Sequence, residues 1–329
     1  MSYNVSKIKL KKFSIFSLGS QKFGYGHYKR SKNLISILKT KSRKFTHYSL
    51  GKNYKNKNKF INQLKFDYDS NNNIIIDFTN SLFLNEKTIL KLKSIFKKQN
   101  NNKVYIIDSP TKRNLSSILK SDFIKTLIPF DISNQIKNNL FKIDNTKIGF
   151  DYFIYSKKSL KKKKKIYDIT VSFGASDKYQ GSLYVLKLLK NLGLNKKVSV
   201  VIGQYFNNNY IKKVDEFCNK NKFKTIFFSN NFSNILNRTK LLITNSGLTK
   251  YEGHMHGIPI LIFSDNNESQ KIDEVFVKKT GHINFSYLKN IENDTLKLKK
   301  IINKKLNVKF NEYKYLKPKV NKIRNFFEK

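Results

Sequence analysis

Three segments combine glycine with polar side chains that could bind a ligand or move a proton. Residues 24–30 read GYGHYKR, residues 173–177 read FGASD, and residues 245–252 read NSGLTKYE. Glycine lets backbone N–H groups approach an anionic ligand closely. Histidine changes its charge near neutral pH, which suits a general base. The segments therefore predict phosphate contacts and one candidate base.

His27, in the first segment, is that candidate base. A helix is predicted to begin beside it, and a helix N-terminus disfavours the charged imidazolium, so that a neutral His27 could accept a proton. Gly24 and Gly26 would let the backbone approach a ligand, but Lys29 stands where a dinucleotide-binding fingerprint has its third glycine. A tight turn with a helix-capping histidine explains the segment equally well.

The other two segments also follow predicted strands. Gly174 opens a turn, and Ser176 or Asp177 could cap the next helix or contact a ligand; for Asp177 alone, capping is the better explanation. Gly247 lies at a predicted strand-to-helix junction, where free N–H groups suit a pyrophosphate. Glu252 could accept hydrogen bonds from ribose hydroxyls, although a glutamate considered alone is more often on the surface.

The elements that must position these segments alternate between strands and helices, which predicts a parallel α/β architecture. In the first half we expect strands at 13–18, 45–50, 74–78, 104–108 and 123–128, with helices at 28–39 and 87–98. In the second half we expect strands at 167–173, 198–202, 225–228, 241–244 and 259–263, and helices at 181–192, 210–219, 232–236, 248–256 and 268–279. A last helix is predicted within 309–329.

A lysine run at 161–165 is too charged for a core and predicts a linker. We therefore expect an N-terminal Rossmann-like domain over 1–158, a second one over 159–306 and a terminal helix over 307–329. The 329 residues suffice for two domains, each with its own core. Open sheets of this kind bind ligands at the carboxyl ends of their strands, where all three segments fall.

The large positive charge of the chain does not by itself indicate a nucleic-acid partner. The formal net charge is +44, which favours anionic ligands, but only five of the 66 cationic residues are arginine. Nucleic-acid readers favour arginine, because its planar fork pairs with phosphate and guanine. Drift of surface positions toward lysine in an AT-rich genome is the better explanation of the excess, and selection for an anionic ligand or surface is the alternative. We expect no nucleic-acid partner.

Other features argue against metal, disulfide and membrane proteins. The single Cys218 excludes a disulfide framework and a cysteine-rich zinc site. Asp67 and Asp69 have the DxD form of metal-dependent glycosyltransferases, but they precede an asparagine run and predict a turn. His254 and His256, two residues apart, would point to different faces of a helix. No apolar run approaches the roughly 18 residues of a membrane span, so we expect a cytoplasmic protein without integral membrane association.

The three segments, in this order, resemble those of the nucleotide-sugar hydrolase family of pseudaminic acid biosynthesis, a family similar to the glycosyltransferases that build peptidoglycan lipid intermediates. The family's GxGHxxR corresponds to 24–30, its DSY to 108–110, its lGpxY to 148–152 and its fGGSD to 173–177. Its GGSTxWE corresponds to 246–252, followed by GxP at 257–259 and NQ at 269–270. Ala175 and Ser246 replace glycines, Leu248 replaces a serine and Pro110 replaces a tyrosine.

The resemblance implies a GT-B-like fold in which two doubly wound, Rossmann-like domains face a cleft. It implies hydrolysis of a UDP-linked diacetamido-trideoxy sugar to UDP and free sugar, with water activated by His27 and with neither cofactor nor metal. The implied substrate contacts are Gly24, Gly26, Arg30, Asp108, Tyr152 and Gln270. The implied nucleotide contacts are Gly174, Ser176, Asp177, Ser246, Gly247, Thr249 and Glu252.

Two alternatives stay open at this point. A GT-B glycosyltransferase would use the same nucleotide domain with a UDP-sugar donor, and a basic nucleic-acid-binding protein would explain the net charge. For the hydrolase we expect a monomer whose partner is the UDP-sugar substrate.

Overall fold

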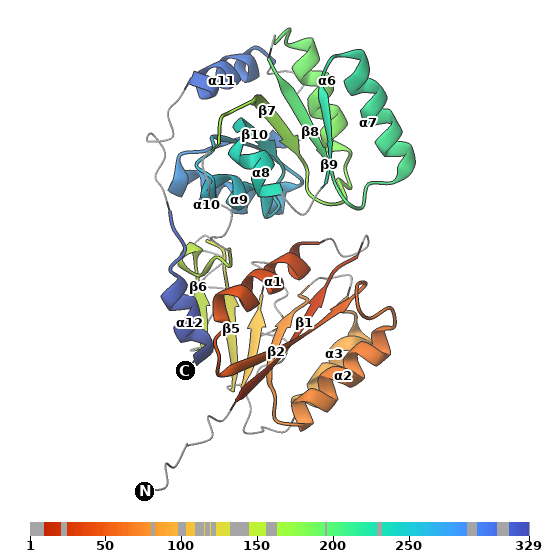
Figure 1. The fold of residues 1–329 in the computed structure, drawn as a ribbon, viewed down its shortest axis with the longest axis vertical. Coiled ribbons are helices and arrows are strands. Elements are labelled where there is room, and N and C mark those ends of the chain that lie inside the picture. The colour runs from red at the N-terminus through yellow and green to blue at the C-terminus, as the bar shows by residue number, and fades with distance from the viewer. Residues whose placement is uncertain are drawn as a thin grey trace, which may run out of the picture. The chain divides into compact units, whose positions relative to one another are not determined.

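The chain forms two compact units, each built around a six-stranded parallel sheet (Figure 1). The first unit comprises Met1–Ser156 and Pro318–Lys329, and the second comprises Lys157–Lys317. The computed structural model describes residues 10–20, 25–79, 83–97, 103–108, 115, 119, 123–131, 145–155, 163–194, 196–228, 232–287, 295–307 and 316–328.

The sheet of the first unit has the strand order β2-β1-β3-β4-β5-β6. Its strands are β1 (Lys11–Leu18), β2 (Arg43–Leu50), β3 (Asn73–Asp77), β4 (Val104–Ile107), β5 (Ile124–Ile128) and β6 (Thr146–Ile148). Its helices include α1 (Gly26–Leu38), α2 (Lys57–Asp69) and α3 (Glu86–Ile95). The strand order reverses between β1 and β3, where Ser17 pairs with Asp77. Such a reversal is where open α/β sheets bind ligands.

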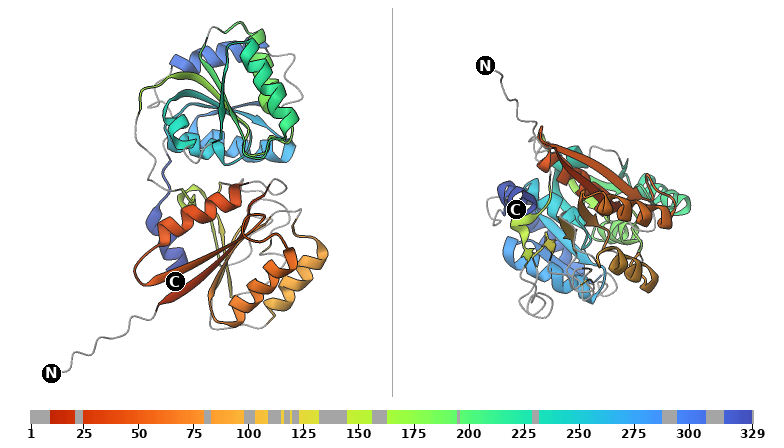
Figure 2. Two further views of the ribbon diagram at one scale, coloured as in Figure 1. Left: turned by 45° about the vertical axis from the view of Figure 1, so that its right-hand side comes forward. Right: turned by 90° about the horizontal axis from the view of Figure 1, so that it is seen from below.

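Both faces of this sheet are covered, which explains its continuous apolar strands. On one face Ile74 and Ile76 pack with residues of α2 and α3, and on the other Ile75 packs with residues of α1 and of the last helix. Figure 2 shows α2 and α3 together on one side of the sheet. The apolar interior therefore extends up to the carboxyl edge, where polar residues begin.

The sheet of the second unit has the order β12-β11-β10-β7-β8-β9. Its strands are β7 (Tyr167–Ser172), β8 (Val198–Ile202), β9 (Lys224–Phe227), β10 (Thr239–Thr244), β11 (Ile260–Ser264) and β12 (Ile283–Tyr287). Its helices are α6 (Gly181–Asn191), α7 (Asn208–Lys220), α8 (Phe232–Asn237), α9 (Thr249–Met255), α10 (Asn267–Thr280) and α11 (Thr295–Asn307). Here the order reverses between β7 and β10, where Ser172 pairs with Thr244.

The last helix, α12 (Val320–Glu328), belongs to the first unit. Phe327 is buried against Tyr105 of β4, with ring centroids 4.8 Å apart, and the Tyr105 hydroxyl donates to the Phe327 carbonyl. Asp151, in the short 3-10 helix Phe150–Tyr152, pairs with Lys322 at 2.6 Å. The end of the chain thus completes the core of its first domain, rather than forming a separate terminal element. Residues 309–315 of the helix predicted there lie outside the described residues.

Several elements were not predicted, and α2 shows why. Its apolar residues Phe60, Ile61, Leu64 and Tyr68 fall on one helical face, but lysine and asparagine separate them in sequence. The turn predicted at Asp67 is wrong, because Asp67 lies in the last turn of α2. There its buried carboxylate accepts a hydrogen bond from Gln63. The strands β6 and β12 and the helix α11 were also missed.

Truncating the α12 contact tests whether this helix is part of the core. We expect Phe327→Ala to lower the free energy of unfolding by about 3–5 kcal/mol, because the buried ring leaves a cavity beside Tyr105. Phe66→Ala, on the exposed side of α2, is the matched control and should change it by less than about 0.5 kcal/mol. Urea denaturation measures both. Equal, small effects would contradict the packing described here.

Candidate functional site

The carboxyl edge of the first sheet holds a buried charged cluster around Asp77, the last residue of β3. His27 Nδ1 lies 2.7 Å from Asp77 Oδ1, Arg30 Nε donates to Oδ2 at 3.0 Å, and Ser31 Oγ donates to Oδ2 at 3.2 Å. Arg30 Nη2 also pairs with Oδ1. The three donor residues are spaced i, i+3 and i+4 on α1, so one helical face presents them together.

The partners of the cluster determine which ring nitrogen of His27 carries the proton. Burial alone would raise the pKa of Asp77, but the Arg30 guanidinium and the hydrogen bond from His27 lower it to about 2. Asp77 is therefore a carboxylate at neutral pH, and its oxygens only accept hydrogen bonds. Arg30 Nη2 lies 3.2 Å from the same Nδ1, but arginine only donates, so the carboxylate is the partner of Nδ1–H.

A neutral His27 then has its lone pair on Nε2. The His27 side chain is 17% exposed, whereas that of Asp77 is fully buried, so the ring joins the buried carboxylate to the surface of the unit. This is the arrangement in which a carboxylate orients a histidine to act as a base.

The structure brings together only some of the predicted substrate contacts of this unit. His27 and Arg30 meet at Asp77, Gly26 begins α1, and Gly24 lies outside the described residues. Asp108 is buried just after β4, the strand next to β3. Tyr152 follows β6, three strand spacings or about 14 Å from β3. It packs against the apolar cluster around α12, so the structure does not place it beside His27.

Sequence reasoning missed Asp77, although a signal was present. The residue ends the strand Asn73–Asp77 directly after three isoleucines, where a charge is costly unless it has partners. Its partners lie 46 to 50 positions earlier in the chain, so no local motif connects them.

The other histidines have partners that the sequence did not indicate. His47 on β2 contacts Ser17 Oγ at 2.8 Å and stacks on Tyr28, and burial, assisted by Lys32, lowers its pKa to about 4. In the second unit His254 Nδ1 lies 2.9 Å from His282 Nε2. Burial lowers the pKa of His254 to about 4. These rings are neutral structural groups at pH 7.

In the second unit, Asp177 has a structural function. Its carboxylate accepts hydrogen bonds from the first amides of α6, those of Gly181 and Ser182, both at 2.8 Å, and from the Tyr210 hydroxyl at 2.7 Å. Burial raises the pKa of Asp177, and these donors oppose the shift. The capping interpretation is therefore confirmed. Gly174, with φ +79°, opens the turn that contains Ser176.

The β10–α9 junction places the third segment at the reversal of strand order. Thr249 begins α9, and the Gly247 amide donates to the Asn245 side chain at 3.3 Å. Glu252 is only 7% exposed, so the surface position expected of an isolated glutamate is wrong. Gln270 lies on α10, where its side-chain amide donates to Glu274 at 3.3 Å.

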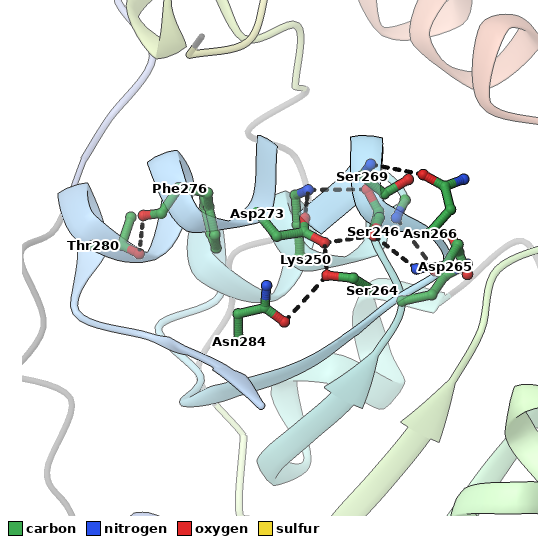
Figure 3. Close-up of polar contacts among 12 residues, drawn as sticks. Ser246, Lys250, Ser264, Asp265, Asn266, Ser269, Asp273, Phe276, Thr280 and Asn284 are labelled. Atoms are coloured by element: carbon green, nitrogen blue, oxygen red, sulfur yellow. Dashed lines mark hydrogen bonds and ion pairs between the residues drawn. The ribbon is translucent and has the colours of Figure 1, made fainter. Parts of the chain in front are cut away.

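A second buried ion pair lies beneath this junction. Lys250 Nζ pairs with Asp273 of α10, and Ser246 Oγ donates to the same carboxylate (Figure 3). Sequence reasoning missed this pair, because Lys250 falls at an unspecified position of its motif. Nearby, burial raises the pKa of Asp265 to about 6 although the Asn245 amide donates to it.

Among the residues that the structure describes, no three His, Cys, Asp or Glu side chains gather as metal ligands would. Within the same part of the chain, no helix has both the length and the apolar character needed to cross a membrane.

Solved structures share this fold at low sequence identity. MurG from Acinetobacter baumannii has a TM-score of 0.61 at 9% identity, over 97% of this chain and all of that one. UDP-GlcNAc 2-epimerase from Methanocaldococcus jannaschii, in complex with UDP-GlcNAc and UDP, has a TM-score of 0.58 at 14% identity. The match covers 97% of this chain and all of that one. Anabaena Alr3699/HepE in complex with UDP-glucose has a TM-score of 0.57 at 9% identity, over 96% of this chain and 98% of that one. These likenesses confirm the predicted GT-B-like fold.

Sequence comparison adds one relative. The uncharacterized protein MJ1062 of Methanocaldococcus jannaschii is 24% identical in an alignment of 205 residues, which covers 57% of this chain and 40% of the relative. The chain thus spans about two fifths of the length of the curated relative it matches. No protein-family model matches the chain.

The Asp77 cluster predicts a loss of stability in acid. The folded pKa of about 2 lies below the ordinary value of 3.8, so the cluster's contribution is complete above about pH 4 and is lost as the pH falls through 2. The shift corresponds to about 2 kcal/mol of unfolding free energy. Urea denaturation at pH 5 and at pH 2.5 measures it.

Two variants isolate this contribution. Asp77→Asn should flatten the acid dependence, because the titrating carboxyl is gone, whereas Asp69→Asn removes an exposed carboxylate of α2 and should keep the wild-type profile. The same acid dependence in wild type and Asp77→Asn would show that Asp77 is not the source.

Proposed function

We propose that this chain hydrolyses a UDP-linked sugar and that His27 is the general base. The observation that carries the proposal is the contact between His27 Nδ1 and the ionised Asp77 carboxylate. It leaves Nε2 of a neutral ring to take a proton from water. Arg30 supports the base indirectly, because its guanidinium keeps Asp77 ionised.

The bond changes follow from this assignment. Water loses a proton to His27 Nε2 as its oxygen attacks the anomeric carbon, and the bond from that carbon to the β-phosphate oxygen breaks. UDP leaves with the bonding electrons, and the free sugar keeps the oxygen of water. Asp77 then faces an imidazolium, whose positive charge it stabilises.

The nucleotide would bind at the reversal of strand order in the second unit. In this proposal the turn at Gly174 and Ser176 and the junction at Ser246, Gly247 and Thr249 supply backbone and hydroxyl donors for the departing diphosphate. Glu252 would accept from the ribose, and Asp177 would act by fixing the start of α6. The UDP and UDP-sugars bound in structures of the same fold support a uridine nucleotide.

The resemblance refines the substrate to a diacetamido-trideoxy sugar of nonulosonic acid biosynthesis. Asp108 and Gln270 are the proposed contacts to the sugar in addition to Gly26 and Arg30. The resemblance also implies that the reaction needs no metal, so turnover should survive EDTA.

A panel of UDP-sugars, incubated with the protein in ¹⁸O-labelled water and followed by mass spectrometry, tests the reaction. We expect free sugar that carries the label and unlabelled UDP, without any acceptor. Label in the nucleotide would show cleavage at phosphorus, and sugar release that requires an added acceptor would identify a glycosyltransferase. Either result would contradict the proposal.

Replacing the base should reduce the rate of the chemical step. We expect His27→Asn to lower kcat by roughly 10²–10⁴-fold, the usual contribution of a general base. His47→Asn removes a neighbouring histidine whose ring is bonded to Ser17, and it should keep kcat within about threefold. Steady-state assays with saturating substrate measure kcat for both variants. His27 is not the base if its variant also stays within that limit.

Replacing the proposed ribose contact should weaken nucleotide binding. We expect Glu252→Ala to cost about 1–3 kcal/mol of UDP affinity, because a buried, charged hydrogen bond is lost. Glu274→Ala, an exposed glutamate of α10, is the control. Calorimetric titration with UDP measures both variants, and unchanged affinity of Glu252→Ala would remove this residue from the site.

A further inference from the structure

Lys250 is a lysine held entirely inside the second unit. It is 1% exposed, and its ammonium makes two described polar contacts, one with the Asp273 carboxylate and one with the backbone carbonyl of Ser246 at 3.0 Å. The rings of Tyr251 and Phe276 lie 5.0 and 5.8 Å from Nζ. Burial lowers the pKa of Lys250, and Asp273 opposes the shift.

Stability alone does not explain such a pair. Two charges taken out of water regain in mutual attraction about what they lose in hydration, and well-packed apolar residues often replace them at no cost. The pair is therefore better explained by the part of the backbone that it holds.

The pair holds Ser246 at two points. Asp273 Oδ1 faces Lys250, while Oδ2 faces the hydroxyl of Ser246 and that of Ser264, the latter at 2.7 Å (Figure 3). Lys250 in turn binds the Ser246 carbonyl, so both the side chain and the main chain of Ser246 are anchored. The Asp265 amide adds a contact to Ser246 Oγ at 3.4 Å.

Ser246 lies in the loop that leads from β10 into α9. A ligand loop that is already rigid binds more tightly, because less conformational entropy is lost on binding. The charge of Lys250 also offsets that of Asp273, which lies beneath a loop that would receive a diphosphate.

From this geometry we infer that the buried Lys250–Asp273 pair is a positioning device that holds the 246–248 loop in the conformation that binds the diphosphate of the nucleotide. Neither residue touches the ligand in this account; each acts through Ser246. The inference rests on the proposed function for its ligand, but the anchoring of the loop does not.

Two measurements distinguish the anchoring of the loop from the binding of the nucleotide. Hydrogen exchange of the amides of residues 246–248 reports on the loop without nucleotide, and calorimetry with UDP reports on binding. Lys250→Met leaves Asp273 buried and unpaired by lysine, and it should lose both stability and affinity. The variant Lys250→Met with Asp273→Leu removes both charges while keeping apolar bulk, so it should fold.

For this double variant we expect amide exchange at 246–248 to accelerate about tenfold or more and UDP affinity to fall about tenfold, even where the melting temperature is restored. Thr170→Val is the matched control. It removes buried contacts with Ser199 and Thr239 inside the same sheet, and it should lower the melting temperature without changing either readout.

Three results would overturn the inference. A folded double variant with wild-type exchange shows that the pair does not anchor the loop. Faster exchange with unchanged UDP affinity shows that the anchoring does not serve the nucleotide. Equal losses of UDP affinity in Thr170→Val and in the double variant show a general effect of stability. Absence of UDP binding by the wild-type chain would instead contradict the proposed function, while the exchange data would still decide the anchoring.

Discussion

Asp77 carries a negative charge to the carboxyl end of β3, directly after the apolar residues 74–76. The organisation of the first unit follows from how that charge is held. A buried carboxylate is tolerated only with partners, and all of its described donors come from the start of one helix. The charge therefore fixes α1 against β3 and, with it, the position and the tautomer of His27. One interaction thus serves folding and presents the candidate base.

The second unit applies the same principle with different residues. Its sheet interior is apolar, and its buried charges gather where strand order reverses, in the Asp177 contacts with α6 and in the Lys250–Asp273 pair. In both units, helices begin just beyond strands at points where apolar packing ends. Ion pairs and hydrogen bonds consequently set the geometry of the loops that would meet an anionic substrate.

Sequence alone indicated the fold because parallel strands covered on both faces read as continuous apolar runs, such as Val104–Ile107. It missed α2 because lysine and asparagine separate the apolar residues in sequence, although these residues fall on one helical face. It singled out His27, which lies in a local glycine motif, as a candidate base, but it missed Asp77, whose contact with His27 depends on strand register across 50 residues. The Lys250–Asp273 pair was missed for a similar reason. It depends on the packing of α9 on α10, which the sequence motifs of these two segments do not indicate.

The central claim is that Asp77 holds a proton on Nδ1 of His27 and leaves Nε2 free to accept one. Nitrogen-15 NMR of the histidine rings distinguishes the two tautomers directly, at a pH where the ring of His27 is neutral. We predict a protonated Nδ1 and an unprotonated Nε2 in the wild-type chain, and a loss of this preference in Asp77→Asn. A wild-type spectrum with the proton on Nε2 would contradict the account.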